Sequence, residues 1–216
     1  MIKTKAFLIH HRPFQEQGLL LDFLTLEFGM VRCVAKNARK SRTKIPHFTL
    51  LDISLVGKSE LKSLRGFEVV KPNLNLKKED KFLLLYVNEL LYRLLHQYDE
   101  CVRIFNKYQT LITSIVIVKN IAKYWQLRLF EEVLLSSLGY ELSYEVKSNK
   151  YYIFKDNIGF VEDKDGYFLG DDLQKIKSSF NDCPNEKVLK QWRNLSRLRF
   201  KSLLGNEPLK TKELFR

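Results

Sequence analysis

A run of unopposed cations is the feature of the sequence best suited to chemistry. No acidic residue occurs from Phe28 to Leu51. Six basic residues fall within thirteen positions of that stretch: Arg32, Lys36, Arg39, Lys40, Arg42 and Lys44. Each cation can neutralise one phosphate of a nucleic acid and release its counterions. The run therefore predicts a phosphate-binding surface; the alternative is a solvated basic face that only keeps the chain soluble.

Two further sets of residues extend the predicted nucleic-acid site. Additional cations occur on the flanking segments: Arg12, Lys58, Lys62 and Arg65. Side chains that could stack on bases occur close to the cations in the sequence: Phe14, His47 and Phe48.

A second basic surface is predicted near the C-terminus. Four cations are spaced three, four and four residues apart: Lys190, Arg193, Arg197 and Lys201. On a helix they share one face, and the apolar residues Val188, Trp192, Leu195 and Leu203 take the other. Three interpretations remain open: a second nucleic-acid contact, a docking site for an acidic partner peptide, and a solvated face.

Patterns for catalysis or metal binding are weak. The fragment Gly57-Lys58-Ser59 ends like a phosphate-binding loop, but that motif needs Gly where Asp52 stands. The adjacent carboxylates Glu131 and Glu132 would face different directions on a helix. The three cysteines lie too far apart for zinc-binding spacing: Cys33, Cys101 and Cys183. We therefore expect a chain that is not an enzyme and that takes no metal or cofactor.

Composition limits the classes of protein. Of 216 residues, 45% are hydrophobic, which is enough for a sizeable core and excludes a disordered chain. The net charge of +12 favours polyanionic partners. The longest uncharged stretch, from Tyr108 to Val118, is shorter than the roughly 20 residues of a membrane-spanning helix. We expect a soluble, cytoplasmic protein of two small domains.

The first 70 residues have the pattern of short strands. Runs rich in Val, Ile, Leu and Phe predict five strands, at 3–10, 18–26, 30–36, 50–56 and 60–70. Turn-forming residues such as Arg12-Pro13 and Gly57-Lys58 separate them. Five such strands predict a small closed barrel, with the basic run on its third strand and the following loop, near the face on which such barrels commonly hold single-stranded nucleic acid.

After residue 78 the apolar spacing becomes helical. Asp80 is a candidate N-cap for a helix that runs to about Gln97. Two further helices are predicted at 102–118 and 120–138, and Gly139 would end the second. The β-branched residues 111–118 leave a strand possible there.

The remaining chain predicts a β insertion and a long helix. Strands are expected at 151–155 and 159–161, within a loop-rich segment at 140–170. Pro184 predicts the start of a helix that ends before Gly205. The fold class is thus α+β, with a five-stranded barrel domain at 1–78 and a mainly helical domain, carrying the small β insertion, at 79–216.

Four segments resemble one family. Phe7 to Lys40 (FLIHHRPFQEQGLLLDFLTLEFGMVRCVAKNARK) resembles the N-terminal barrel of the RecO family of bacterial recombination mediators. That family shares R-x-[FY]-x-E-x-x-LLLD-x-[FL]-T-x-E-x-G followed by VAK-G-AR. Its helical-domain signatures resemble YVNELLYRLL from Tyr86, LRLFEEVLLSSLGY from Leu127 and LGNEPLKTKELF from Leu204. The four matches occur in the family's order and span the chain, which makes the resemblance specific.

The resemblance implies that the barrel is an oligonucleotide-binding (OB) fold, and it also implies a function. Members bind single- and double-stranded DNA, anneal complementary strands, bind RecR and help to load RecA onto gapped DNA, in some settings with RecF. They also bind the acidic C-terminal tail of the single-stranded DNA-binding protein. Arg128 matches the arginine that contacts this tail, while Leu135 and Leu138 either line its apolar pocket or belong to the helix core. The resemblance implies a bacterial, nucleoid-associated location. An RNA- or ribosome-associated OB-fold protein remains the alternative.

The sequence departs from the family at two places. Many relatives carry four cysteines after the LGY signature, forming a zinc site, whereas residues 140–170 contain none. We therefore predict that this segment holds no zinc and relies on its own apolar residues: Tyr151, Ile153, Phe160 and Phe168. Asn37 replaces the usual Gly after VAK, and Asn tolerates left-handed backbone better than most residues do.

Overall fold

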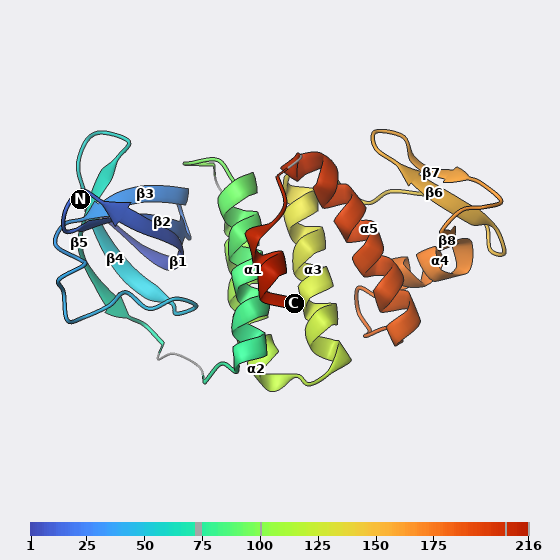
Figure 1. The fold of residues 1–216 in the computed structure, drawn as a ribbon, viewed down its shortest axis with the longest axis horizontal. Coiled ribbons are helices and arrows are strands. Elements are labelled where there is room, and N and C mark those ends of the chain that lie inside the picture. Colours follow the sequence, from blue (N-terminus) through green and yellow to red (C-terminus); the bar gives the residue numbers. More distant parts are fainter. Residues whose placement is uncertain (72–74, 100, 206, 216) are drawn as a thin grey trace. The chain divides into compact units, whose positions relative to one another are not determined.

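The computed structural model describes residues 1–71, 75–99, 101–205 and 207–215 (Figure 1). The chain divides into two compact units. The first unit contains residues 1–116 and 208–216, and the second contains residues 117–207. The predicted domain boundary at residues 78 and 79 lies within the first of these units. Within the described part of the chain, no helix has the length and apolar character needed to cross a membrane.

The first unit begins with a closed five-stranded barrel. Its strands are β1 (Ile2–Phe14), β2 (Gly18–Thr25), β3 (Gly29–Ala35), β4 (Leu51–Val56) and β5 (Lys62–Val69). They close in the order β1-β2-β3-β5-β4, and every pair is antiparallel except β3 with β5. The predicted five-stranded barrel is therefore confirmed.

Alternation of side chains fills the barrel. In β4, Leu51, Ile53 and Leu55 are buried, and the residues between them are more exposed. This period of two is what a strand with one face on a core requires. The same core takes side chains from the other strands, among them Ala6, Leu8, Leu21, Phe23, Val31 and Cys33.

Strand β1 is longer than predicted. The turn expected at Arg12-Pro13 is wrong, because these two residues pair with Leu20 and Leu19 of β2. Pro13 is tolerated there because β4 pairs only with the beginning of β1, so no ladder bond is needed from the proline nitrogen on that side. The chain turns instead at residues 15–17, which follow β1.

Helices α1 (Lys78–Leu94) and α2 (Val102–Ile117) follow the barrel. The N-cap position of α1 is Lys77, so the predicted cap at Asp80 is wrong; Asp80 is buried in the first helical turn. Residues 111–117 are helical, which removes the strand alternative. Aromatic contacts join barrel and helix, because the Phe7 ring lies 5.1 Å from that of Tyr108 in an edge-on arrangement.

A bulge in β1 strengthens this contact between barrel and helices. The pairing register of β1 with β2 shifts between Leu8 and His10. At this point Asn88 Nδ2 donates a hydrogen bond of 2.9 Å to the Ile9 carbonyl. Tyr108 in turn donates to the Asn88 side-chain oxygen at 2.5 Å. This buried chain of hydrogen bonds fixes β1 against α1 and α2.

The second unit combines helices with a small sheet. Its elements are α3 (Ile121–Ser137), β6 (Tyr151–Lys155), β7 (Gly159–Glu162), β8 (Phe168–Leu169), α4 (Gly170–Ser178) and α5 (Glu186–Leu204). The sheet order is β7-β6-β8, with antiparallel pairs. Both predicted insertion strands are confirmed. Helix α4 was not predicted, because it is short and Leu173 and Ile176 are its only large buried apolar residues.

Three boundary predictions in the second unit have clear outcomes. Gly139 follows α3 at φ +86° and Gly205 follows α5 at φ +66°, which confirms both as left-handed helix ends. Pro184 precedes α5 rather than opening it. The N-cap is Asn185, whose Oδ1 accepts a hydrogen bond of 3.0 Å from the Val188 amide.

Aromatic residues hold the β insertion, as expected, but one of them was assigned wrongly. Phe168 is buried and Phe160 packs edge-on against it with ring centroids 5.5 Å apart. Tyr151 is 49% exposed, and the neighbouring Tyr152 is buried in its place. A strand alternates its faces, so a register error of one residue exchanges the buried and exposed positions.

Candidate nucleic-acid interface

The basic loop leaves the end of β3 and returns at β4 without regular secondary structure. Asn37 lies at φ +57°, in the left-handed region where a glycine would otherwise be favoured. The Lys40 and Ser41 amides donate to the Asn37 carbonyl at 3.1 and 3.2 Å. The Arg39 amide donates to the Gln17 carbonyl at 3.0 Å, which anchors the loop to the turn after β1. Asn37 therefore takes the left-handed backbone conformation that the sequence analysis expects an Asn to tolerate there.

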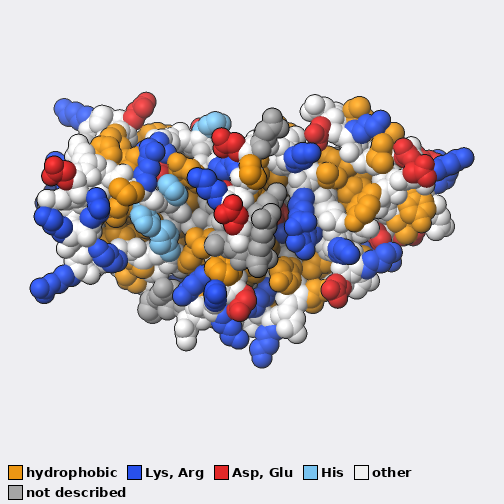
Figure 2. Space-filling model, in the orientation of Figure 1, with side chains coloured by type: hydrophobic (Ala, Val, Ile, Leu, Met, Phe, Trp, Pro, Cys, Tyr) orange, Lys and Arg blue, Asp and Glu red, His pale blue; other side chains and the backbone are white. Residues whose placement is uncertain are grey.

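Five of the six predicted loop cations are exposed: Lys36, Arg39, Lys40, Arg42 and Lys44. The side-chain bonds of Arg39 and Lys44 go to backbone carbonyls, those of Glu16 and Arg39, at 3.0 and 3.2 Å. These bonds orient the two side chains without cancelling their charge. Figure 2 shows Lys and Arg side chains projecting around the barrel, with hydrophobic and His side chains between them.

Arg32 differs from the other loop cations. Its Nε lies 2.6 Å from Oδ1 of Asp22, a carboxylate that is almost fully buried on the neighbouring strand β2. The positive charge of Arg32 is thus balanced within the barrel. Sequence reasoning missed this pair because Asp22 lies outside the acid-free stretch and meets Arg32 only through strand pairing.

The flanking cations lie on three parts of the barrel. Arg12 is exposed on β1, and Lys58 and Arg65 are exposed on the β4–β5 connection and on β5. Lys62 is half-buried and pairs in register with Cys33 of β3, close to the point where the basic loop begins. Its Nζ donates to the Ser59 carbonyl at 2.7 Å. Lys62 is the flanking cation that the strand pairing brings beside the loop.

The predicted stacking residues separate into two groups. Phe48 is buried and lies at φ +56°, so its ring is not available to a base. Phe14 and His47 are half-buried and keep part of their surface open. The exposed part of His47 belongs to a group of three histidines that the sequence did not single out.

The three histidines lie on the barrel surface. His47 Nε2 and His11 Nδ1 are 3.1 Å apart. His10 stacks on the Tyr92 ring of α1 with centroids 4.2 Å apart, and its Nδ1 lies 3.5 Å from Asp22 Oδ2. Burial lowers the pKa of His47, and the charge of His11 lowers it further. The pKa of His11 is lowered by loss of hydrating water and by His10.

Helix α3 carries the residue expected to contact a partner tail. Arg128 is buried, and its Nη2 lies 2.7 Å from Oε1 of the fully buried Glu131. Leu135 is fully buried and Leu138 is half-buried. Within the same unit, burial and the charges of Arg197 and Arg128 lower the pKa of Arg193. The exposed Arg193 of α5 is thus close enough to Arg128 for their charges to interact.

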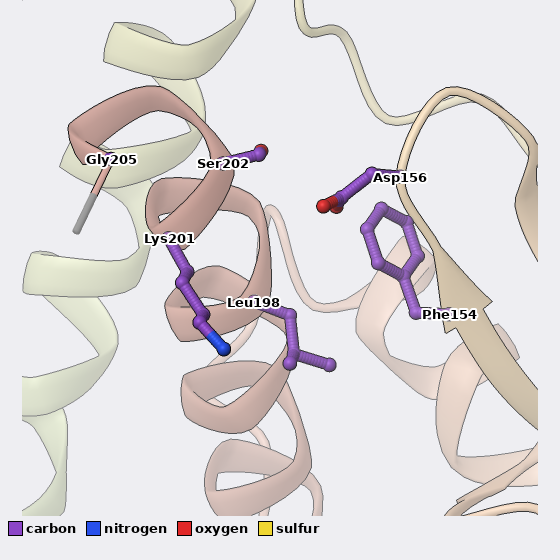
Figure 3. A pocket seen from close by; sticks show the side chains of 6 residues that line it. All are labelled: Phe154, Asp156, Leu198, Lys201, Ser202 and Gly205. Carbon is purple, nitrogen blue, oxygen red and sulfur yellow. The ribbon is translucent and has the colours of Figure 1, made fainter.

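The predicted basic face of α5 is exposed at all four positions, Lys190, Arg193, Arg197 and Lys201, and Val188, Trp192 and Leu195 are buried opposite it. Tyr167 is exposed beside this face, where its hydroxyl accepts a hydrogen bond of 2.7 Å from Asn194. A cavity of about 350 Å³ separates the end of α5 from strand β6. Its lining residues are Phe154, Asp156, Leu198, Lys201, Ser202 and Gly205 (Figure 3).

The structure also bears on metal binding. Among the residues for which the structure gives positions, no three His, Cys, Asp or Glu side chains converge as metal ligands would. Burial raises the pKa of Cys33 to about 12 and that of Cys101 to about 11, which disfavours the thiolate form that binds metals.

The five strands, closed by a parallel β3–β5 pair, define the barrel of the first unit as an OB fold. Residues 1–73 match the family model described as Recombination protein O N terminal. DNA repair protein RecO of Psychromonas ingrahamii is 31% identical over 227 residues, covering 97% of this chain and 96% of that protein. The Coxiella burnetii protein of the same name is 37% identical over 97% of this chain and 95% of its own. The corresponding values for Escherichia coli are 33%, 98% and 93%. The chain belongs to the RecO family of DNA repair proteins.

Proposed function

We propose that the chain binds single- and double-stranded DNA through the basic loop of its barrel and acts as a recombination mediator. The observation that carries this proposal is the set of five exposed loop cations on an OB fold of the RecO family. A basic loop that contacts phosphates binds the phosphodiester backbone without reading bases, so it suits strands of any sequence. Annealing needs no nucleotide, because a polycation screens the repulsion between two strands and holds them at high local concentration.

Charge reversal in the loop tests the DNA site. Arg39, Lys40 and Arg42 changed to Glu should abolish binding of a labelled oligonucleotide. A matched control reverses the same number of charges at exposed lysines of the second unit, Lys155, Lys164 and Lys175. Equal loss in both variants would show that only net charge matters, and wild-type affinity in the loop variant would refute the site.

Salt dependence provides a second test of the loop. Five phosphate contacts predict a log-log slope on single strands of about −3.5, or about a 100-fold loss of affinity between 50 and 200 mM salt. Arg32 is left out of this number because Asp22 balances its charge. A slope near zero would exclude phosphate binding as the main source of affinity.

The partner half of the proposal concerns the acidic tail of the single-stranded DNA-binding protein. Arg128, with Leu135 and Leu138, is the site implied by family resemblance, and the exposed Arg193 and Arg197 add cations to the same region. An acidic peptide that ends in an apolar residue requires a cation beside an apolar surface. The basic face of α5 could instead be a further DNA contact. Tyr167 supports this alternative, because its exposed ring offers a surface on which a base can stack.

The design of the tail experiment follows from the Arg128–Glu131 pair. Removing Arg128 alone would leave a buried carboxylate without this partner and destabilise the second unit. Arg128→Ala is therefore combined with Glu131→Gln, and Arg193→Ala with Arg197→Ala forms a separate variant. Both should weaken tail-peptide binding and leave affinity for bare DNA nearly unchanged. Parallel loss of both activities would indicate misfolding or a shared DNA site.

Mediator activity requires a combined measurement. The annealing rate of complementary oligonucleotides coated with single-stranded DNA-binding protein is compared for intact and tail-deleted coating protein. Acceleration that depends on the tail supports annealing and partner binding together. RecR binding, and loading of RecA with or without RecF, belong to the same proposal and are tested by adding these proteins to the annealing reaction.

The second candidate function is that of an RNA- or ribosome-associated OB-fold protein, which the basic charge favours equally. DNA and RNA of matched sequence should compete similarly for a loop that binds phosphates. Preference for RNA would point to recognition of the 2′-hydroxyl and would favour this second function.

A further inference from the structure

Two imidazole rings face each other at the end of the basic loop. His47 follows Lys44 by three residues on the loop, and His11 is exposed on β1 beside Arg12. Their facing nitrogens are 3.1 Å apart and their ring centroids 5.1 Å apart. One nitrogen must donate and the other accept for this hydrogen bond to form. The pair can therefore hold one shared proton between the two facing nitrogens. If both facing nitrogens carried a proton, two donors would meet and this hydrogen bond would be lost.

The surroundings of the pair favour its neutral form. His10 is the titratable neighbour whose charge acts on both rings. The buried carboxylate of Asp22 on β2 is engaged with Arg32 of β3 and faces His10. From α1, Tyr92 stacks on His10. The carboxylate is thus committed to His10 and Arg32, and burial disfavours a net charge on the pair.

The position of the pair links it to the phosphates bound by the loop. His47 is held by contacts on both sides, with His11 on β1 and with the ring of Phe48 at 5.8 Å. Phe48 takes a left-handed backbone conformation that bulky residues rarely adopt. Such conformations persist only where the surroundings impose them, and they gather at binding sites. The end of the loop is therefore held against β1 in a fixed geometry, with His47 three residues after Lys44, the last cation of the loop.

We propose that the His11–His47 pair is a proton-dependent contact for a phosphodiester of bound nucleic acid. This inference rests on the proposed DNA-binding function and assigns a further part of that same site. A phosphate placed at the pair supplies the negative charge that the pair lacks and accepts a hydrogen bond from the exposed His11 ring, while a proton on His47 adds positive charge behind it. The contact takes up protons as the strand binds, so the surface gains charge only when a phosphate is present.

The direction of the pH effect follows from linkage. An anion at the pair raises the pKa of the imidazoles relative to the free protein, so the complex binds more protons than the separate molecules do. Affinity for a strand must then rise as the pH falls. If binding raises one imidazole pKa by about one unit, affinity is about tenfold higher at a pH below both values than above them. Each added proton also steepens the salt slope on single strands by about 0.7.

The experiment measures affinity of the full chain for a labelled single-stranded oligonucleotide between pH 5.5 and 8.5 at constant ionic strength. Wild type should gain about tenfold in affinity toward acid pH. His11→Gln and His47→Gln should bind with nearly constant affinity, because Gln keeps hydrogen-bonding groups but cannot titrate. The matched control is His96→Gln, an exposed histidine beyond the end of α1, which should keep the wild-type pH profile.

A gain-of-charge variant protects the test against misfolding. His11→Arg carries a permanent cation and should bind at pH 8 as tightly as wild type binds near pH 6. Retention of the wild-type pH profile by the two Gln variants would overturn the assignment. A pH dependence of affinity that disappears only in His10→Gln would also overturn it, because the proton would then be taken up at the His10–Asp22 contact.

These results are separable from failure of the proposed function. A chain that binds no DNA at any pH would refute the DNA site itself. Wild type and the triple charge-reversal variant of the loop would then be indistinguishable in the binding assay. A chain that binds DNA through the loop with equal pH dependence in wild type and both Gln variants would refute the histidine contact alone.

Discussion

Nη1 of Arg199 donates hydrogen bonds to both carboxylate oxygens of Glu132, at 2.6 and 2.7 Å, in the core of the second unit. Trp192 Nε1 donates to the same carboxylate at 2.9 Å. The charge of Glu132 on α3 is thus neutralised by Arg199 of α5. These hydrogen bonds fix the register of α5 against α3. This pair ties the helix that carries the basic face to the helix that carries Arg128.

Breaking this pair should be costly. Arg199→Met leaves the Glu132 carboxylate buried without a cation and is expected to destabilise the second unit by about 3–5 kcal/mol. Both tryptophans, Trp125 and Trp192, belong to this unit, so urea unfolding followed by tryptophan fluorescence reports on it. Adding Glu132→Gln, which removes the charge and keeps an acceptor for Trp192, should recover most of the loss. A double variant as unstable as the single one would contradict the electrostatic explanation.

Glu89 of α1 should control the last segment of the chain. Its carboxylate accepts hydrogen bonds from the Lys210 and Thr211 amides, at 2.7 and 2.9 Å, and from the Thr211 hydroxyl at 2.6 Å. These amides open the 3-10 helix η1 (Lys210–Phe215), which contacts α1. Glu89→Ala should therefore speed hydrogen exchange of both amides and destabilise the first unit by about 1–3 kcal/mol. Unchanged exchange at Lys210 and Thr211 would show that other contacts hold the segment.

Asn37 offers a test of the loop path. Its φ of +57° is accessible to Gly and Asn, and is costly for a β-branched residue. Asn37→Gly should change unfolding free energy and DNA affinity little. Asn37→Val should cost about 1–2 kcal/mol and should lower DNA affinity, because the turn that presents Lys40 would be displaced. Equal DNA affinity of the two variants would mean that the loop binds without this turn.

Much of the barrel could be predicted from local pattern, because each strand carries its own alternation and its own flanking turns. The helix ends at Gly139 and Gly205 were also predictable from local sequence, since each depends on a single glycine at positive φ. Two of the errors lie where two signals compete at one position. Asp80 has the chemistry of a cap but is buried within the first helical turn, and Pro13 signals a turn but lies on a part of β1 that has one neighbouring strand.

The candidate site was predictable only in part. The exposed cations of the loop lie within nine positions of the sequence, so the local pattern predicted them. The Arg32–Asp22 pair depends on strand register, and His11 and His47 are 36 positions apart, so no local pattern reports that their nitrogens meet. Glu89 and Thr211 are separated by 122 positions for the same reason. Such contacts follow from topology, which brings distant residues together after each element has formed.

The thiols should differ strongly in reactivity. Cys183 is exposed, whereas Cys33 is buried in the barrel and has its pKa raised to about 12 by burial and then by Asp22. The thiolate is the reactive form, so an aromatic disulfide reagent at pH 8 should label Cys183 first. Cys33 should react only when the barrel opens, and its labelling should accelerate in urea. Fast labelling of Cys33 in the native chain, located by peptide mapping, would contradict the buried assignment.

The His11–His47 pair should make the free barrel less stable in acid. Burial lowers the pKa of His47 in the folded chain below its ordinary value of 6.5, so the unfolded chain binds more protons as the pH falls through this range. Stability contributed by the neutral ring is complete above about pH 7.5 and is lost progressively below pH 6.5. Urea unfolding of the barrel, followed by circular dichroism, should show this loss in wild type and a smaller one in His47→Gln. With saturating oligonucleotide the pH dependence of stability should reverse, so that wild type becomes more stable as the pH falls. A phosphate that raises the same pKa makes the folded complex bind more protons than the unfolded chain does. An acid loss of equal size with and without DNA would show that no phosphate reaches the pair.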